Sequence, residues 1–224
     1  MSKNKKLIIF GDSAFAEIAY EYFTHDSPYE VAAFAVSREY LKRDRLFDVP
    51  VVAFEDVTKT HPPSDYEMHV ALVYNNLNRN RMHFYRAAKE RGYRLANYVS
   101  SRAFVWRNVT MGDNCFIFED NTVQPFVQLG SNIVLWSGNH IGHHSIIGSH
   151  CFISSHVVIS GFCEVGEACF FGVNSTVGNN IKIGRDSLIG AAALIVKDTG
   201  EAKLFKGTPA AAGPESTLKK FGLV

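Results

Sequence analysis

The chain lacks several features that mark large classes of protein. It has 224 residues but only four cysteines, none in a C-x-x-C pair, so neither a thiolate metal centre nor a redox dithiol is expected. The 23 Lys and Arg side chains nearly balance the 22 Asp and Glu side chains, and the net charge is +1. No basic stripe suggests a nucleic-acid partner. No apolar run approaches the length of a membrane span.

A cytoplasmic location is expected from two further features. Residues 1–6 lead into a short strand rather than into a secretory segment. Unpaired cysteines suit a reducing compartment.

What the chain does have is a period of six residues. Every sixth residue from 105 to 195 is apolar, and nine of these are followed directly by glycine. Such a hexapeptide repeat is typical of a parallel β-helix, in which three hexapeptides form one triangular coil and residues eighteen apart stack. The sequence predicts about five coils with no long loop between them. The apolar series is Val105, Met111, Ile117, Val123, Leu129, Leu135, Ile141, Ile147, Ile153, Ile159, Val165, Phe171, Val177, Ile183, Ile189 and Ile195.

A second column of smaller side chains lies two residues before the first. Because side chains alternate in a strand, both columns face the inside of the prism. All four cysteines fall in this column, so we interpret them as packing groups. The glycines are expected at corners with left-handed backbone. The column contains Ala103, Val109, Cys115, Val127, Ser145, Cys151, Val157, Cys163, Cys169, Ser175, Ser187 and Ala193.

The first hundred residues have a different pattern. Strands alternate with helices, which predicts a small parallel, Rossmann-like α/β domain. The turn at Gly11-Asp12-Ser13 could hold a phosphate on free backbone N–H groups. It has one glycine where a dinucleotide fingerprint has three, so an ordinary turn capped by Asp12 or Ser13 is at least as well supported. We expect strands at 7–10, 31–36, 51–54, 69–74 and 94–99, and helices at 14–23 and 79–91.

The whole chain resembles a hexapeptide-repeat sugar acyltransferase of the sialic acid O-acetyltransferase type, the family that also holds bacillosamine and perosamine N-acetyltransferases. The repeat over 103–198 and the closing Gly207-Thr208-Pro209-Ala210, similar to a terminal G-x-P-A, carry the resemblance. It implies a left-handed β-helix, a homotrimer with active sites between subunits, and acetyl-CoA as the acyl donor. The expected division is a sugar- or nucleotide-binding domain over 1–100, the β-helix over 101–198, and a cap and tail over 199–224.

Histidine provides the candidate base. Transfer of an acyl group from a thioester requires removal of a proton from an amine or hydroxyl, and neutral imidazole suits that task. The resemblance implies that His143, a few residues before Ile147-Gly148, is the general base. His144 stands where the family often has a carboxylate that orients the base. Either His144 accepts the hydrogen bond, or the orienting group lies elsewhere, on Asn139 or a neighbouring subunit.

The other histidines of the cluster have weaker assignments. His140 is expected on a flat outer face, at the trimer contact beside Trp136. His150 is expected at a solvated corner. His156 could line the substrate and coenzyme groove, and a plain surface position is about as well supported.

The coenzyme site also follows from the resemblance. It implies a wall on which small residues let backbone amides approach the pantetheine chain and one N–H stabilises the oxyanion. Lys197, with Lys203 and Lys206, could meet the phosphates, although a solvated surface explains any one of them. The wall residues are Gly172, Val173, Asn174, Gly190 and Ala191.

The acceptor site is expected in the first domain. Ser13-Ala14-Phe15-Ala16 replaces the family's Gly- and His-bearing loop, and residues 35–38 replace its acidic pair. These departures put uridine recognition in doubt and leave another nucleotide, or a sugar without one, open. Amide side chains could bind sugar or base, and guanidinium groups a phosphate. The candidates are Gly11, Ser13, Asn75, Asn76, Arg79 and Arg81.

The leading hypothesis is therefore an acyl-CoA-dependent sugar N- or O-acyltransferase with no metal. A zinc carbonic anhydrase-like trimer and a non-catalytic trimeric scaffold are the alternatives. The sequence does not choose between an amine and a hydroxyl acceptor.

Overall fold

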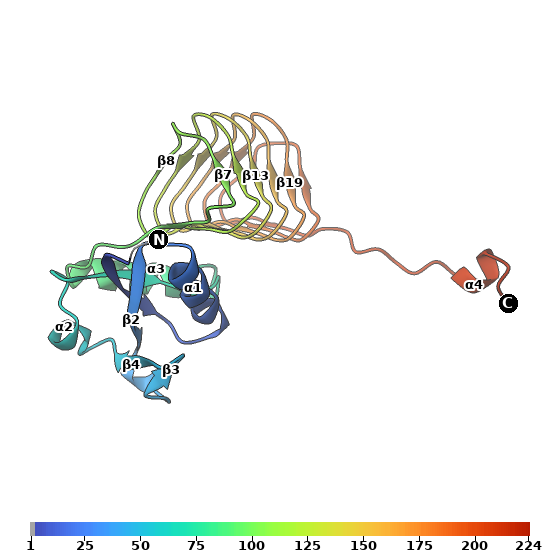
Figure 1. The fold of residues 1–224 in the computed structure, drawn as a ribbon. Coiled ribbons are helices and arrows are strands. Elements are labelled where there is room, and N and C mark those ends of the chain that lie inside the picture. Colours follow the sequence, from blue (N-terminus) through green and yellow to red (C-terminus); the bar gives the residue numbers. More distant parts are fainter. Residues whose placement is uncertain (1–2) are drawn as a thin grey trace.

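Residues 3–224 are described by the computed structural model, and they divide between an α/β sheet and a triangular stack of short strands (Figure 1). The sheet has the order β3-β4-β2-β1-β5, with β1 parallel to β2 and β5 and only β3 antiparallel to its neighbour. Its elements are β1 (Lys5–Phe10), α1 (Ala14–His25), β2 (Tyr29–Val36), the 3-10 helix η1 (Arg38–Tyr40), β3 (Arg45–Leu46), β4 (Val49–Ala53), α2 (Val57–Thr60), β5 (Tyr66–Val70) and α3 (Arg79–Glu90).

β1 is central because it is apolar on both faces. Leu7 and Ile9 pack on the side of α1, while Ile8 and Phe10 pack with residues of α3. A parallel strand covered on both sides requires such a continuous apolar run. The expected strand at 69–74 ends at Val70. The strand expected at 94–99 is reduced to β6 (Tyr98–Val99), which belongs to the stack rather than to this sheet.

The stack has three walls of parallel strands, named A, B and C in chain order. Wall A contains β6, β9 (Phe116–Ile117), β12 (Val134–Leu135), β15 (Phe152–Ile153), β18 (Phe170–Phe171), β21 (Leu188–Ile189) and β23 (Leu204–Phe205). Wall B contains β7 (Phe104–Val105), β10 (Thr122–Val123), β13 (His140–Ile141), β16 (Val158–Ile159), β19 (Thr176–Val177) and β22 (Leu194–Ile195). Wall C contains β8 (Thr110–Met111), β11 (Gln128–Leu129), β14 (Ile146–Ile147), β17 (Glu164–Val165) and β20 (Lys182–Ile183).

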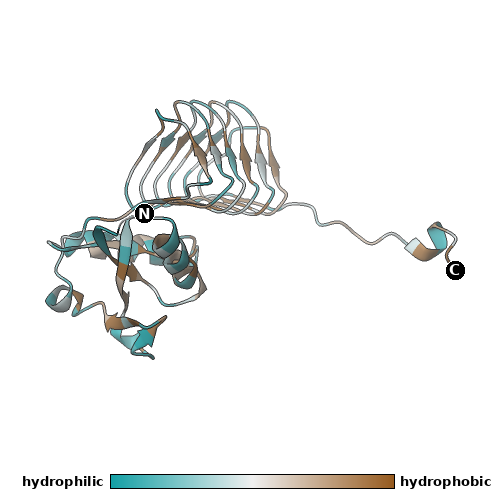
Figure 2. Ribbon diagram, viewed as in Figure 1, coloured by the Kyte–Doolittle hydropathy of each residue, from teal (hydrophilic) through white to brown (hydrophobic). Residues whose placement is uncertain are grey.

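The expected register is confirmed. Paired residues on neighbouring strands are eighteen apart, as in Ile141 opposite Ile159. Every residue of the apolar series ends a two-residue strand, and those from Ile117 onward are buried in one core. All four cysteines are free and buried among them, as the packing interpretation required. In Figure 2 the brown, hydrophobic strands recur from coil to coil.

The glycines that follow the apolar series were expected to have left-handed backbone, and this expectation was wrong. The repeat glycines do not have positive φ; the left-handed residues lie two positions later, as in Asn114 (φ 55°) and Asn174 (φ 57°). Glycine is required instead for space, because coils stack closely there. A Cβ on Gly142 would lie 2.5 Å from the backbone nitrogen of Gly161, well inside any real contact.

The corners form three edges, each named by the two walls it joins. The left-handed residues of edge AB are 120, 138, 156, 174 and 192; those of edge BC are 126, 144, 162 and 180; those of edge CA are 114, 132, 150, 168 and 186.

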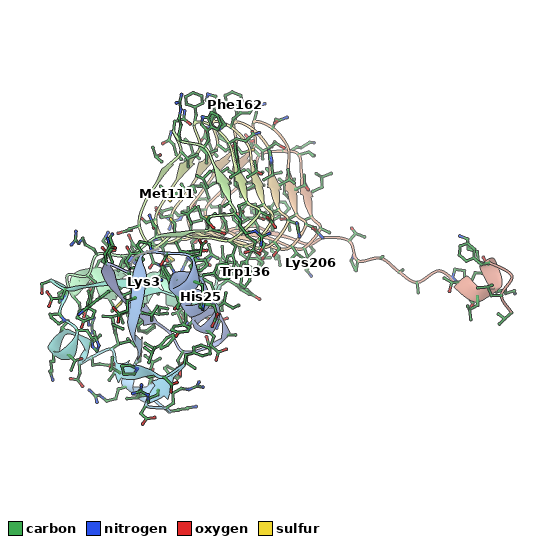
Figure 3. All side chains as sticks on the ribbon, in the orientation of Figure 1. Lys3, His25, Met111, Trp136, Phe162 and Lys206 are labelled. Atoms are coloured by element: carbon green, nitrogen blue, oxygen red, sulfur yellow. The ribbon has the colours of Figure 1, made fainter. Side chains whose placement is uncertain are left out.

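The α/β layer packs on wall A. Phe15 and Tyr22 of α1 contact Phe116 and Phe118, and Phe15 also lies 6.0 Å from the Trp136 ring. Trp136 stands on the side of the stack that faces α1 (Figure 3). It was expected at an outer trimer contact, which is wrong, because the domain of its own chain covers it.

After the last coil the chain adds β23 to wall A and then leaves the stack. Residues 208–224 extend outward and end near the short helix α4 (Thr217–Lys220) (Figure 1). The expected cap is thus made by the turn before β23, and the tail does not cover the coil end. The division at residues 100 and 198 stays a prediction. In the part of the chain that the structure describes, no helix is both long and apolar enough to span a lipid bilayer.

Candidate active site

His143 and His144 lie together on edge BC, between β13 and β14. Both side chains are exposed, and their Nδ1 atoms are 3.1 Å apart. One of the two nitrogens must therefore donate a proton and the other must accept it. The backbone N–H of His143 donates to Oε1 of Gln124 at 2.9 Å, which fixes the corner beneath the ring.

The His143 ring lies close to Gly161 of the next coil. A Cβ on Gly161 would be 2.9 Å from Cε1 and 3.0 Å from Nε2, so any other residue would displace the imidazole. No group among residues 3–224 hydrogen-bonds Nε2 of His143. That nitrogen is available to a substrate.

Aromatic rings enclose His144. Its ring stacks on Phe126 at 4.6 Å and on Phe162 at 4.8 Å between centroids. Phe162 also meets His143 edge to face at 5.0 Å. Phe162 stands at the vertex of the stack opposite the α/β domain (Figure 3). Sequence reasoning missed both phenylalanines, although their spacing of eighteen from His144 was a readable signal.

The expected coenzyme wall is on a different edge. The structure brings Gly172, Val173, Asn174, Gly190 and Ala191 together on edge AB in two successive coils. A Cβ on Gly172 would lie 2.5 Å from the Ala191 nitrogen, so the two coils touch there. The backbone N–H groups of Val173 and Ala191 donate to no group among residues 3–224. Wall B separates this edge from His143 within the chain.

Two lysines differ in their placement. Lys206 lines a recess of about 800 Å³ together with Gly190 and Ala191, at the base of the C-terminal tail. Lys197 follows β22 instead, on the far side of wall B from those residues. Lys197, Lys203 and Lys206 were all expected to meet coenzyme phosphates, and of these Lys206 lines the recess beside the wall.

His156 shares edge AB with the wall residues. It is exposed, and its ring lies over Gly138, where a Cβ would be 2.6 Å from Cε1 and from Nδ1. His140 points outward from wall B and is half-buried. The structure therefore places His156 next to Asn174, one coil away, and leaves it apart from His143.

Arg81 has a role other than the one expected. It is fully buried, and Nη2 donates to Oδ1 of Asn78 at 2.9 Å and to the carbonyl oxygens of His150 at 3.0 Å and Cys151 at 3.2 Å. Burial lowers the pKa of Arg81 to about 10, so it remains a cation at neutral pH. The guanidinium joins α3 to edge CA and cannot reach a phosphate.

Arg79 makes a second contact between α3 and edge CA, and we call this set of contacts the joint. Its Nη2 lies 2.5 Å from a carboxylate oxygen of Asp186. The expectation that Arg79 or Arg81 binds a phosphate is therefore not supported by where they lie. Both guanidinium groups serve contacts between α3 and the coils because α3 packs beside edge CA.

His150 belongs to the same joint and not to a solvated corner. It is 7% exposed, and its Nδ1 accepts from Nδ2 of Asn132 at 2.9 Å. Desolvation lowers the pKa of His150 to about 4, with Arg81 adding repulsion. The earlier expectation was wrong because α3 covers edge CA, which the repeat pattern alone does not reveal.

A recess of about 300 Å³ lies at the carboxyl ends of β1 and β2, the place where parallel sheets bind ligands. Gly11 has φ +117°, and a Cβ there would lie 3.0 Å from the Ala71 carbonyl oxygen. Asp12 pairs with Arg43 at 3.5 Å, which offsets its negative charge. The recess is lined by Phe10, Gly11, Asp12, Ser13, Val36, Ser37, Tyr40, Leu72, Asn75, Asn80 and Phe84.

Three of the sequence candidates, Gly11, Ser13 and Asn75, meet in this recess. Asn76 lies beside it, with Nδ2 donating to Oδ1 of Asn80 at 3.1 Å. Sequence reasoning missed Asn80, although it falls in the same polar run as Asn75 and Asn76. Among residues 3–224, no group of three or more His, Cys, Asp or Glu side chains is arranged to hold a metal ion.

No family model matches the sequence, and no curated protein matches it. Solved structures do match. PerB from Caulobacter crescentus, in complex with CoA and GDP-perosamine, is 23% identical over 92% of this chain and 96% of its own, with a TM-score of 0.80. The acetyltransferase domain of PglB from Neisseria gonorrhoeae FA1090 is 20% identical over 93% of this chain and 99% of its own, with a TM-score of 0.81.

The chain shares the fold of these proteins. WeeI from Acinetobacter baumannii AYE has it too, at 16% identity over 93% of this chain and 99% of its own, with a TM-score of 0.63. The expected left-handed β-helix behind a small α/β domain is thereby confirmed. Structures of the perosamine N-acetyltransferase with a histidine replaced by Asn or Ala also carry CoA and GDP-perosamine. A specific likeness to sialic acid O-acetyltransferases stays a prediction.

Proposed function

We propose that this protein is an acyl-CoA-dependent sugar N- or O-acyltransferase that uses acetyl-CoA. Its acceptor is a nucleotide-linked amino sugar of surface-glycan biosynthesis. The fold shared with PerB, which binds CoA and GDP-perosamine, supports this class. The observation that carries the proposal is the His143 imidazole, whose Nδ1 is engaged by His144 while Nε2 is open to a substrate.

The proposed reaction needs one base and one oxyanion site. Nε2 of His143 takes a proton from the acceptor as the acceptor's nitrogen or oxygen attacks the thioester carbonyl. The C–S bond then breaks, and the CoA thiolate receives that proton. The free N–H groups of Val173 and Ala191 are suited to stabilise the tetrahedral oxyanion.

A homotrimer completes this site. Because wall B separates His143 from the Gly172–Asn174 wall, one chain does not hold base and coenzyme together. If wall B faces a threefold axis, edge BC of one copy meets edge AB of the next. Wall B suits burial, since Phe104, Val158 and Leu194 point outward and are 51%, 37% and 66% exposed.

The ligands are assigned to the two recesses. Lys206, with Gly190 and Ala191, would meet the phosphate end of the coenzyme. Gly11, Ser13 and Asn75, with Asn76 beside them, would hold the nucleotide or sugar, and His156 would line its path toward the neighbouring base. A cytoplasmic location suits the four free cysteines.

The test is a thioester-consumption screen with acetyl-CoA over nucleotide-linked amino sugars and plain glycans, with the product identified by mass spectrometry. Thioester loss with one acceptor class, abolished in His143→Ala, is the expected result. No consumption with any acceptor, together with no CoA binding, would overturn the proposal. Stoichiometric zinc with carbon dioxide hydration would replace it by the carbonic anhydrase-like alternative.

A further inference from the structure

At the left-handed corners of edges AB and CA the residue is Asn, Asp, Gly, Ala or His, whereas edge BC carries two phenylalanines. Asn, Asp and Gly adopt positive φ at least cost, and they occupy corners such as Asn132, Asn174 and Asp186. On edge BC the corner residues are Phe126, His144 and Phe162, with φ of 65°, 60° and 58°. Unfavourable backbone of this kind clusters at functional sites.

The phenylalanine corners are confined to the coils directly before and after that of His143. One coil further along the same edge, the corner returns to Asn180 at φ 60°. One coil earlier, Asn108 accepts a hydrogen bond from the backbone N–H of Phe126 through its Oδ1. The departure is thus tied to the candidate base and is not a property of the whole edge.

The rings of Phe126, His144 and Phe162 lie face to face in a row, which we call the aromatic clamp. The planes of His144 and its neighbours differ by 26° and 17°. His143 stands at 88° to His144 and at 88° to Phe162. This arrangement aims Nδ1 of His144 at Nδ1 of His143.

We propose that Phe126 and Phe162 are positioning residues: they clamp His144 so that its Nδ1 accepts a hydrogen bond from the Nδ1–H of His143 and holds the base in the Nε2-unprotonated tautomer. His144 then orients His143 and fixes its tautomer, as a carboxylate does where it accepts a hydrogen bond from a histidine. It adds no negative charge, so the clamp contributes orientation and tautomer selection only. The phenylalanines act through His144 and need not touch a substrate.

This inference rests on the proposed function, because it assumes that His143 is the base. Phe126→Asn and Phe162→Asn, singly and together, are suited to test it, since Asn is cheaper at positive φ and should preserve the corner. Ala202→Asn is the matched control, an exposed left-handed corner (φ 53°) away from the site. Phe162→Tyr keeps a ring, and His144→Glu supplies an acceptor that needs no clamp.

We expect the double variant to lose roughly 10–100-fold in kcat through misorientation of the base. KM for both substrates and the oligomeric state should be unchanged, and the melting temperature equal or higher. Phe162→Tyr and Ala202→Asn should keep wild-type kcat. Nitrogen-15 NMR of histidine-labelled protein should show His143 protonated at Nδ1 in the wild type and a tautomer mixture in the double variant. His144→Glu should make kcat insensitive to Phe126→Asn.

Wild-type kcat in the double variant, or an unchanged His143 tautomer, would overturn the clamp. If the double variant dissociates, the single variants that keep the assembly decide by the same readings. Failure of the proposed function looks different: His143→Ala would then retain wild-type turnover. An inactive His143→Ala beside fully active phenylalanine variants removes only the clamp.

Discussion

The side-chain amide of Asn78 donates to the carbonyl oxygens of Ala168 and Cys169, each at 3.2 Å, across ninety residues of sequence. Asn78 is buried at the start of α3, with φ 66°, and its Oδ1 accepts from Arg81. The first turn of α3 thus holds the α/β domain to the coil stack through hydrogen bonds. The joint holds the recess at the carboxyl ends of β1 and β2 in a fixed orientation relative to edge AB.

Arg81→Ala should therefore destabilise the protein by about 3 kcal/mol, since it leaves several buried acceptors without a donor. Urea unfolding followed by circular dichroism measures this. Arg86→Ala, an exposed position on the same helix, is the control and should be near neutral. Equal stability of the two variants would show that the joint contributes nothing.

His143→Ala should lower kcat by roughly 10²–10⁴, the usual contribution of a positioned general base. Coenzyme binding, measured by calorimetry, should be retained. His83→Ala, an exposed histidine on α3, provides the control. Full activity of His143→Ala with an inactive His156→Ala would move the base to edge AB.

Assembly should depend on wall B and not on wall C. Val158→Asp puts a charge on wall B, and Ile146→Asp puts the same charge at a similarly exposed position on wall C. We expect light scattering to find dissociated chains and lost activity for the first, and an intact, active trimer for the second. A monomeric wild type at micromolar concentration would contradict the assembly outright.

The interior of the coils should tolerate a polar side chain only where that side chain finds a hydrogen-bond partner. Ile159 is fully buried, so Ile159→Asp should unfold the stack at a cost of several kcal/mol. Cys169 donates through Sγ to the Gly184 carbonyl at 3.3 Å, and a hydroxyl can replace that contact. Cys169→Ser and Cys151→Ser should therefore keep most activity. A melting temperature unchanged in Ile159→Asp would contradict the register.

Acid should weaken the fold through buried neutral histidine. His69 is 1% exposed, its Nδ1 donates to the Ala96 carbonyl, and burial lowers its pKa to about 4. The unfolded chain binds the proton near pH 6.5, so stability falls as pH drops from about 6.5 to about 4, by roughly 3 kcal/mol for this group. His69→Phe should flatten that slope in unfolding measured across the range, whereas exposed His156→Ala should not.

The repeat made the stack predictable to the residue. Val123, Ile141 and Ile159 occupy their expected inner positions because a period of six admits one register only. The reason for the repeat glycines was harder to predict, since glycine is required both where φ is positive and where two backbones approach closely. The φ values of these glycines, together with the distance from Gly142 to the next coil, separate the two causes.

The candidate site could be predicted where it is local and not where it depends on docking. His143 and His144 are neighbours in sequence, and their contact is one of the alternatives that the resemblance left open. Arg81 and His150 were misassigned because their burial requires α3 to lie on edge CA. No spacing rule links residue 81 to residue 150, so the joint emerges only once the two domains are packed.

Because each coil has eighteen residues without interruption, the position of a residue along the prism axis follows directly from its residue number. A loop can lengthen by one residue without consequence elsewhere, but this stack can grow only by whole hexapeptides without turning its core outward. Insertion of a complete coil between Arg81's anchor at Asn132 and the corner at His144 would keep every wall intact. It would nevertheless separate Asn132 from His150 and Cys151, all of which accept hydrogen bonds from the one Arg81 guanidinium, so the docked α3 fixes how many coils can lie between them.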